Sequence, residues 1–365
     1  MLLEKTKIYG VDNVEGSATL TRTDASVGLG YAVNASTIDS DFDRCYPWCE
    51  MKEVTDELGN VFIRIPKFYT KITKNSNGTY KYQISGCRYD GFGTLFVDGK
   101  GNELDYVLVG KYEGSYDSEN SRMMSKSGQT VKVSIALPNY RKACRAVGEG
   151  YQQYDFLIDA IIKELFMIEF ATTHSQSIMT GFTSGSNTAA LITGHTDKVA
   201  TASGSYNNNH DLETDPWVDA TCNTDGVHAC KYRGIENPWG NVWKWCDGIN
   251  FNKEKIYLCE SPTEYESDKY ESPYTYVGDR LMTGGYVTKI TPFAKNPLLG
   301  FVTATGGGST TYYADNYYVA ETGTVLLCGG YWNYGGRAGL WLWLGSGSSS
   351  DTYGYLGGRL CYKPL

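Results

Sequence analysis

The sequence predicts an α+β protein with two helices, short antiparallel strands and long loops. Glycine (42 residues) and tyrosine (30) are abundant while proline (10) is scarce, and this balance suits tight turns and aromatic-rich surfaces better than a helical bundle. Two segments carry helical apolar spacing, and shorter ones alternate at the period of a strand. We therefore expect a strand-poor, loop-rich architecture, with a core that the apolar fraction of 41% can supply.

The N-terminal part of the chain differs in composition from the rest. Residues 1–50 are rich in Thr, Ser and Asp, and we assign them to attachment or oligomerisation. Residues 51–365 form the main domain in this interpretation. Within it, residues 61–72 alternate at period two on either side of Pro66, as an edge strand would, and residues 106–112 form a second strand.

The helices are predicted in the middle of the chain. Apolar residues recur at helical spacing in residues 138–147 and again in residues 156–170. Residues 184–224 and 261–276 are polar and rich in small or turn-forming residues, which predicts long surface loops. Residues 324–328 are continuously apolar apart from one threonine and predict a buried strand.

Charge and composition exclude several classes of function. The formal net charge is −8 and no long basic run is present, so we expect no nucleic-acid partner. The most apolar stretch, residues 156–171, is interrupted by four charged residues, so we expect no membrane insertion. Residues 1–7 lack the apolar core of a secretory signal. Ten cysteines are scattered through the chain, which favours reduced, mostly buried thiols.

The densest aromatic motif is residues 236–248, where three tryptophans fall within seven residues beside turn formers. Physical reasoning alone predicts an aromatic core under a tight turn. The run Gly-Asn-Val-Trp-Lys-Trp at residues 240–245 resembles the signature of the formylglycine-generating-enzyme branch of the C-type lectin fold. Residues 63–66, 111–113 and 169–171 lie in the order that this branch uses. The resemblance implies a C-type lectin fold.

The C-terminal segment is rich in glycine, tyrosine and tryptophan, and it ends with Leu356-Gly-Gly-Arg-Leu-Cys361. It is similar to the variable region of target proteins of diversity-generating retroelements, and we place this region at residues 326–365. In that family an error-prone reverse transcriptase randomises template adenines, so that Asn codons yield many residues but not Trp, Met, Gln, Lys or Glu. Met, Gln, Lys and Glu are absent between Tyr331 and Arg359.

The resemblance implies two sets of residues. The variable, ligand-binding positions would be Tyr331, Asn333, Tyr334, Arg337, Leu342, Leu344, Ser346, Gly347, Asp351, Tyr353 and Tyr355. The fixed scaffold would be Trp239, Asn241, Trp243, Trp245, Trp332, Trp341 and Trp343. We expect the four tyrosines to act as aromatic anchors, Arg337 and Asp351 as charge-specific contacts, and the two leucines as apolar area.

A physical argument supports this division. In a strand, Trp341 and Trp343 fall on one face and Leu342 and Leu344 on the other, so one pair packs and the other is exposed. Rigid aromatic anchors among small residues are what a binding surface of the antibody type needs. The alternative is that these tyrosines and leucines simply complete the core.

Enzymatic and metal-binding functions are disfavoured. The oxidase of the same fold branch uses a cysteine pair shortly after the corresponding glycine turn, whereas no cysteine lies between Cys328 and Cys361. Cys222, His228 and Cys230 match no zinc-finger spacing. Glutamate-proline-asparagine motifs of calcium-dependent lectins are absent as well. We therefore expect no catalytic activity, no metal and no cofactor, although aromatic stacking on a sugar ring stays open.

The function predicted from these residues is recognition without turnover. The resemblance implies a phage or prophage tail protein, made in the bacterial cytoplasm and carried on the virion, with the bacterial cell surface as the alternative location. Its partners would be a host-cell surface protein or glycan receptor and other tail proteins, and the chain would form a homo-oligomer. The alternatives are a relative of the oxidase and an invariant lectin-like carbohydrate-binding or structural tail protein.

Overall fold

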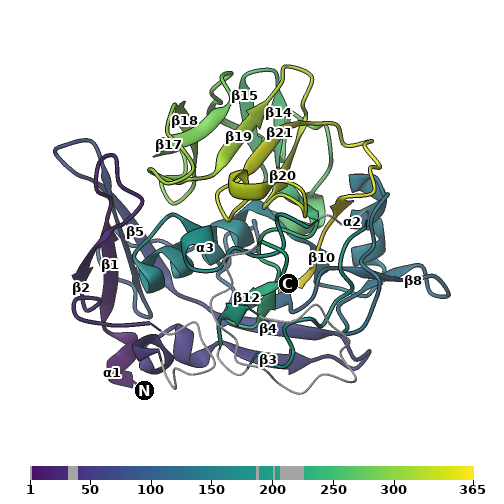
Figure 1. The fold of residues 1–365 in the computed structure, drawn as a ribbon, viewed down its shortest axis with the longest axis horizontal. Helices are drawn as coiled ribbons and strands as arrows, with labels where there is room; N and C mark the ends of the chain where they lie inside the picture. The colour runs from purple at the N-terminus through teal and green to yellow at the C-terminus, as the bar shows by residue number, and fades with distance from the viewer. Residues whose placement is uncertain (1, 32–39, 186–188, 200–201, 206–225) are drawn as a thin grey trace.

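The computed structural model describes residues 2–31, 40–185, 189–199, 202–205 and 226–365. The fold is mixed, with many short strands and few helices (Figure 1). Helices α2 (Leu137–Arg145) and α3 (Phe156–Phe170) occupy the two segments with helical spacing, so the prediction of an α+β chain with two such helices is confirmed. The expectation of a strand-poor chain is wrong, because short Thr- and Tyr-rich segments pair over most of its length.

The first sheet has the order β2-β1-β6-β5 and is antiparallel throughout. Its strands are β1 (Ile8–Asp12), β2 (Thr21–Asp24), β5 (Tyr69–Lys74) and β6 (Tyr80–Ser85). The sheet joins residues on both sides of the boundary that we expect at residue 50, and Tyr9 and Val11 are buried in the same core as α3. Residues 1–50 are therefore packed on the rest of the chain where they are described. Their role in attachment stays a prediction.

The second sheet has the order β10-β23-β7-β4-β3. Its strands are β3 (Lys52–Thr55), β4 (Val61–Pro66), β7 (Tyr106–Gly110), β10 (Tyr151–Gln153) and β23 (Leu360–Tyr362). Residues 61–72 form parts of two strands in different sheets, and the edge-strand prediction is wrong for β4, which lies between β3 and β7. It is confirmed for β5, which is the last strand of the first sheet. Pro66 is tolerated there because it is the last residue of β4, beyond Arg64, where the pairing with β3 ends. The C-terminal strand β23 pairs with β7 and β10.

The largest sheet has the order β16-β15-β14-β20-β21-β19-β17-β18, with β22 paired to β14. Its strands are β14 (Trp243–Asn252), β15 (Lys255–Leu258), β16 (Thr275–Asp279), β17 (Gly285–Pro292), β18 (Gly300–Thr305), β19 (Asn316–Val319), β20 (Val325–Cys328), β21 (Trp343–Gly347) and β22 (Leu356–Gly357). β20 confirms the predicted buried strand, because all four of its residues are buried. The sheet is mainly antiparallel, but β19 runs parallel to β21 and β22 runs parallel to β14.

Smaller elements complete the chain. They are α1 (Leu2–Lys5), β8 (Ser115–Asp117), β9 (Arg122–Met124), β11 (Gly204–Ser205), β12 (Cys230–Tyr232), β13 (Ile235–Glu236) and the 3-10 helices η1 (Asp41–Arg44), η2 (Trp48–Glu50), η3 (Ser175–Ser177), η4 (Pro262–Glu264) and η5 (Gly335–Arg337). None of the helices in the described ranges is both long and apolar enough to cross a membrane.

Helix α3 lies at the centre of the molecule, between the N-terminal sheet and the largest sheet (Figure 1). The Asp155 side chain caps its N-terminus by accepting a hydrogen bond from the Ile158 amide at 2.9 Å. The helix is buried almost all round, as expected of a helix that is apolar on every face. Asp159 and Glu169 form ion pairs with Lys163 and Arg233 inside the core, and Lys163 also lies 3.8 Å from the ring centre of Trp343. Among the described residues Glu164 has no ion pair and accepts a hydrogen bond from the Thr70 hydroxyl at 3.1 Å.

Candidate functional site

The chain leaves β20 through two glycines that hold it close to the sheet. Gly329 and Gly330 have φ angles of 88° and 81°, a region that side chains disfavour. A Cβ atom at Gly330 would lie 2.8 Å from Cδ2 of Leu342, so the turn packs directly against the segment that precedes β21. The loop between them, which contains η5, is anchored by Gln176, whose side-chain amide donates to the carbonyls of Gly335 and Ala338 at 2.9 and 2.7 Å.

Five tyrosines lie next to one another on this part of the molecule. In spatial order they are Tyr353, Tyr355, Tyr331, Tyr334 and Tyr318, and we call them the tyrosine row. Successive ring centres are 5.4, 4.6, 5.0 and 5.6 Å apart, and the first two pairs are stacked. Tyr353 is 54% exposed, and the other four are half-buried. The row therefore offers a continuous aromatic surface to solvent.

One cation lies at the end of the row. The guanidinium carbon of Arg337 is 5.3 Å from the ring centre of Tyr334, and its Nη1 donates to the hydroxyl of Tyr318 at 3.3 Å. Arg337 is exposed, as is Asn333 on the same loop. Since these contacts hold the guanidinium in place while leaving it accessible, Arg337 can pair with an acidic or hydroxyl-rich ligand at the edge of the aromatic surface.

Tyr318 is the member of the row that the sequence analysis missed. It lies on β19, which pairs in parallel with β21 so that Tyr318 is opposite Leu344. Along β19, Tyr317 is fully buried and Tyr318 is half-buried. This alternation was a signal in the sequence, but the parallel pairing that brings β19 beside the C-terminal segment is a property of the tertiary fold.

Two of the expected ligand-binding positions are not on the surface. Leu342 is 0% exposed, and Gly347 is buried as well, whereas Leu344 is half-buried. The expected alternation of tryptophans and leucines fails because β21 begins only at Trp343. Leu342 lies in a turn, where its amide donates to the Gly339 carbonyl at 3.1 Å, and its side chain points into the core.

Asp351 and Ser346 occupy intermediate positions. Asp351 is half-buried, and its carboxylate accepts a hydrogen bond from the Ser348 amide at 2.9 Å, which closes a turn after β21. Ser346 is half-buried and lies two residues after Leu344 on β21, so the two share a face of the strand. The contact roles of these two residues stay predictions.

All seven residues of the expected scaffold are buried. The indole of Trp343 stacks on Phe301 with ring centres 4.7 Å apart and an angle of 6° between the planes. Trp243 meets Tyr334 edge-on at 5.0 Å, so the buried frame directly supports the tyrosine row. Asn241 accepts a hydrogen bond from the Leu191 amide at 2.8 Å and donates to the carboxylate of Glu113.

Further indole hydrogen bonds orient the frame. The Nε1 groups of Trp239 and Trp245 donate to the carbonyls of Thr180 and Ile135 at 3.0 and 3.2 Å. Trp332 is 6% exposed, and its ring contacts Tyr331 with ring centres 5.3 Å apart. Trp243 and Trp332 thus support two inner rings of the row, Tyr334 and Tyr331. The satisfied N–H groups of Trp239 and Trp245 leave the buried frame little freedom to move.

Two phenols of the row, those of Tyr334 and Tyr355, have a raised pKa. Burial, followed by the nearby phenols of Tyr318 and Tyr331, raises the pKa of Tyr334. Burial and the neighbouring tyrosines Tyr331 and Tyr353 likewise raise the pKa of Tyr355. These two hydroxyls therefore keep their protons and can each donate and accept a hydrogen bond, beside the positive charge of Arg337. This chemistry suits stacking and hydrogen bonding to a ligand.

The thiols offer little to an oxidase. Nine cysteines lie in the described ranges and none forms a disulfide there. Burial raises the pKa of Cys144 and Cys246 well above the ordinary range and that of Cys361 to about 12, so these groups stay as unreactive thiols. Of the conceivable metal ligands, Cys222 falls outside the described residues, and no cluster of three or more metal-binding side chains occurs within them.

Comparisons with known proteins give weak matches. No protein-family model and no curated protein matches the chain. Among solved structures it is similar to the Major Tropism Determinant P3c variant, with 12% sequence identity over 98% of this chain and 72% of that chain and a TM-score of 0.35. It is similar to the M1 variant at 13% identity, with the same coverage of both chains and a TM-score of 0.32. Scores this low do not establish a shared fold.

Proposed function

We propose that this protein is a non-enzymatic binding protein that presents the tyrosine row and Arg337 to a receptor on a host-cell surface. The observation that carries the proposal is the row itself: five adjoining tyrosines, accessible to solvent and supported by a buried tryptophan frame. Tyrosine and arginine dominate binding hot spots because they supply large contact area and specific hydrogen bonds with few rotatable bonds to immobilise.

We also propose that this surface is diversified by a retroelement and displayed on a C-type lectin fold of the formylglycine-generating-enzyme type. Burial supports the first part, since nine of the eleven expected variable positions are exposed or half-buried while the tryptophans of the frame are buried. The fold is supported by the position of the Gly-Asn-Val-Trp-Lys-Trp motif at the start of β14 and by the return of β23 to β7.

The location in this proposal is the tail of a phage or prophage, with the bacterial cell surface as the alternative. One row of half-buried rings gives a modest contact area, so a homo-oligomer that presents several copies would bind more tightly through avidity. The receptor would be a host-cell surface protein or glycan, and the other partners would be tail proteins. The charge of −8 agrees with a chain that does not bind nucleic acid.

Deep sequencing of the codons for residues 326–365 in a population that carries this gene tests the diversification. Substitutions should concentrate at the accessible positions of the row and its loop and trace back to template adenines, while the codons for Trp332, Trp341 and Trp343 stay fixed. An invariant segment, or variation spread at random along it, would overturn the retroelement claim. The chain would then be an invariant lectin-like binding or structural protein.

Binding can be tested separately with labelled protein and bacterial envelopes. The double variant Tyr331→Ala/Tyr355→Ala removes the stacked centre of the row, and it should lower envelope binding by about tenfold or more if both rings are hot-spot contacts. Tyr276→Ala is a matched control, because Tyr276 is 40% exposed and lies on β16, outside the row. Equal loss of binding in both variants would contradict the assignment of the surface.

A further inference from the structure

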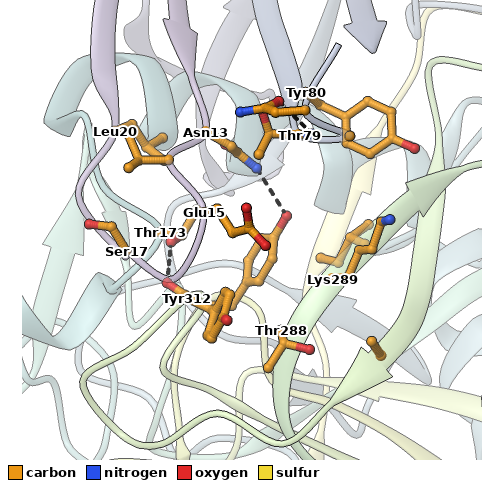
Figure 2. Close-up of a pocket in the computed structure, with 16 residues that line it drawn as sticks. Asn13, Glu15, Ser17, Leu20, Thr79, Tyr80, Thr173, Thr288, Lys289 and Tyr312 are labelled. Carbon is orange, nitrogen blue, oxygen red and sulfur yellow. Dashed lines mark hydrogen bonds between the residues drawn. The ribbon is translucent and has the colours of Figure 1, made fainter. Parts of the chain in front are cut away.

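A cavity lies away from the tyrosine row, between the N-terminal sheet and the β17–β18 hairpin (Figure 2). Its volume is about 240 Å³, slightly below the roughly 300–1,000 Å³ typical of pockets for drug-sized ligands. Its walls come from five separate parts of the chain: the β1–β2 connection, the β5–β6 turn, the segment after α3, the β17–β18 hairpin and the turn before β19. A cavity of this size fits a ligand of a single ring.

The walls combine hydrogen-bonding groups with aromatic rings. The polar side chains include Asn13, Glu15, Thr288 and Lys289, and the ring of Tyr312 lies beside them (Figure 2). Glu15 and Lys289 are both exposed, and neither forms an ion pair with another described side chain. Carboxylate, amide, hydroxyl and ammonium groups around one space can satisfy several hydroxyls at once, because they include both donors and acceptors.

One acceptor in this cavity is buried without a partner. Asn13 donates from its side-chain nitrogen to the Tyr313 hydroxyl at 3.4 Å, but its Oδ1 atom is buried and accepts no hydrogen bond. An unsatisfied buried acceptor costs on the order of 1–3 kcal/mol. A rotation of the Asn13 side chain would turn this oxygen toward the cavity, where a ligand hydroxyl could donate to it and remove that cost. This favours a hydroxyl-bearing ligand over a wholly apolar one.

The aromatic wall is held in place by its own turn. Tyr312 and Ala314 have φ angles of 54° and 58°, which non-glycine residues rarely adopt. The hydroxyl of Thr173 donates to the Tyr312 carbonyl at 2.6 Å and so fixes the turn against the end of α3. A half-buried ring in a fixed orientation beside hydrogen-bonding groups can stack on the apolar face of a pyranose.

From this cavity we propose a second binding site that takes one monosaccharide residue of a glycan, with Asn13, Glu15 and Thr288 bonding to its hydroxyls and Tyr312 stacking on its ring. None of these residues lies within the region proposed to vary. The site would therefore bind the same class of sugar whatever sequence the tyrosine row carries. This inference is independent of the proposed function, because it uses other residues on other elements.

Saturation-transfer NMR with the full chain tests the site, using the methyl glycosides of glucose, galactose, mannose and N-acetylglucosamine as probes at about 10 mM, where a millimolar site is mostly filled. Transfer to the ring protons of at least one glycoside is expected. The double variant Glu15→Gln/Thr288→Val should weaken that binding about tenfold or more, since it removes a charged and a neutral hydrogen-bonding group. Glu57→Gln, on an exposed glutamate in the β3–β4 turn, should leave binding unchanged.

The row and the cavity are distinguished by one further variant. Tyr353→Ala should leave glycoside binding unchanged, because Tyr353 belongs to the row and not to the cavity wall. Absence of transfer to all four glycosides would overturn the proposal, as would binding that survives the Glu15→Gln/Thr288→Val change. Binding that is lost only in Tyr353→Ala would assign the sugar to the tyrosine row instead.

Discussion

Leu342→Ala should destabilise the protein far more than Leu344→Ala, although the two leucines are two residues apart on the same segment. Leu342 is 0% exposed and belongs to a core cluster with Trp243 and Trp245, and its carbonyl accepts the Gly329 amide at 3.0 Å. Truncating a leucine in such a site costs about 2–5 kcal/mol, which includes the cavity left behind. Leu344 is half-buried, so its truncation should cost about 1 kcal/mol or less.

Urea unfolding followed by tryptophan fluorescence measures this difference. If the slopes of the two transitions are equal, the midpoints rank the free energies of unfolding directly. A Leu344→Ala midpoint that falls as far as that of Leu342→Ala would refute the argument from burial.

The same reasoning applies to diversification: codon 342 should retain large apolar residues in a sequenced population, because most other substitutions at a buried position would unfold the chain.

Three further predictions concern backbone, charge and frame. Gly339→Ala should destabilise the protein by about 2 kcal/mol or more, because the φ angle of Gly339 is 152° and the new Cβ would lie 2.2 Å from a buried carboxylate oxygen. At Gly336 the nearest atom to a new Cβ is 3.9 Å away, so Gly336→Ala should be nearly neutral. Thermal unfolding compares the two variants. Burial raises the pKa of Glu164 from 4.5 to about 8, so the folded state binds the extra proton. The contribution of this proton to the free energy of unfolding is therefore fully present below about pH 4.5 and is lost as the pH rises to about 8. Glu164→Gln should consequently raise the melting temperature at about pH 8.5 but not at about pH 4.5. Trp343→Ala should lower the free energy of unfolding in urea by about 3–5 kcal/mol, because Trp343 is buried. Arg337→Ala should lower it by about 1 kcal/mol or less, because the contact of Arg337 with its tyrosine ring is exposed. Equal losses would contradict the division into frame and surface.

The local features of the chain were predictable because they depend on short-range patterns. The spacing of apolar residues identified both α2 and α3, and the apolar run at Val325–Cys328 identified β20. Turn-forming residues beside clustered tryptophans indicated a buried aromatic frame, and all seven expected frame residues are buried. These patterns are visible in a sequence because helix and strand periodicities fix which side chains share a face.

The composition of the binding surface was only partly predictable. Period-two alternation placed Leu342 with Leu344, but β21 starts at Trp343, and a turn carries no such alternation. The sequence did not predict that β3 pairs with β4. Nor did it predict that β1, within the first fifty residues, pairs with β6. Strand pairing between distant segments depends on register and burial in the whole fold, which no local pattern records.

By itself, the sequence determined which residues are suited to bind and which to pack: tyrosines, an arginine and small residues in the C-terminal segment, with tryptophans between them. Only the tertiary structure decided which of those tyrosines adjoin. It brought Tyr318 from β19 into the row through the parallel pairing with β21, and it removed Leu342 from the surface. The physical reason is that side-chain chemistry belongs to each residue, whereas adjacency and exposure arise from packing between segments far apart in the chain.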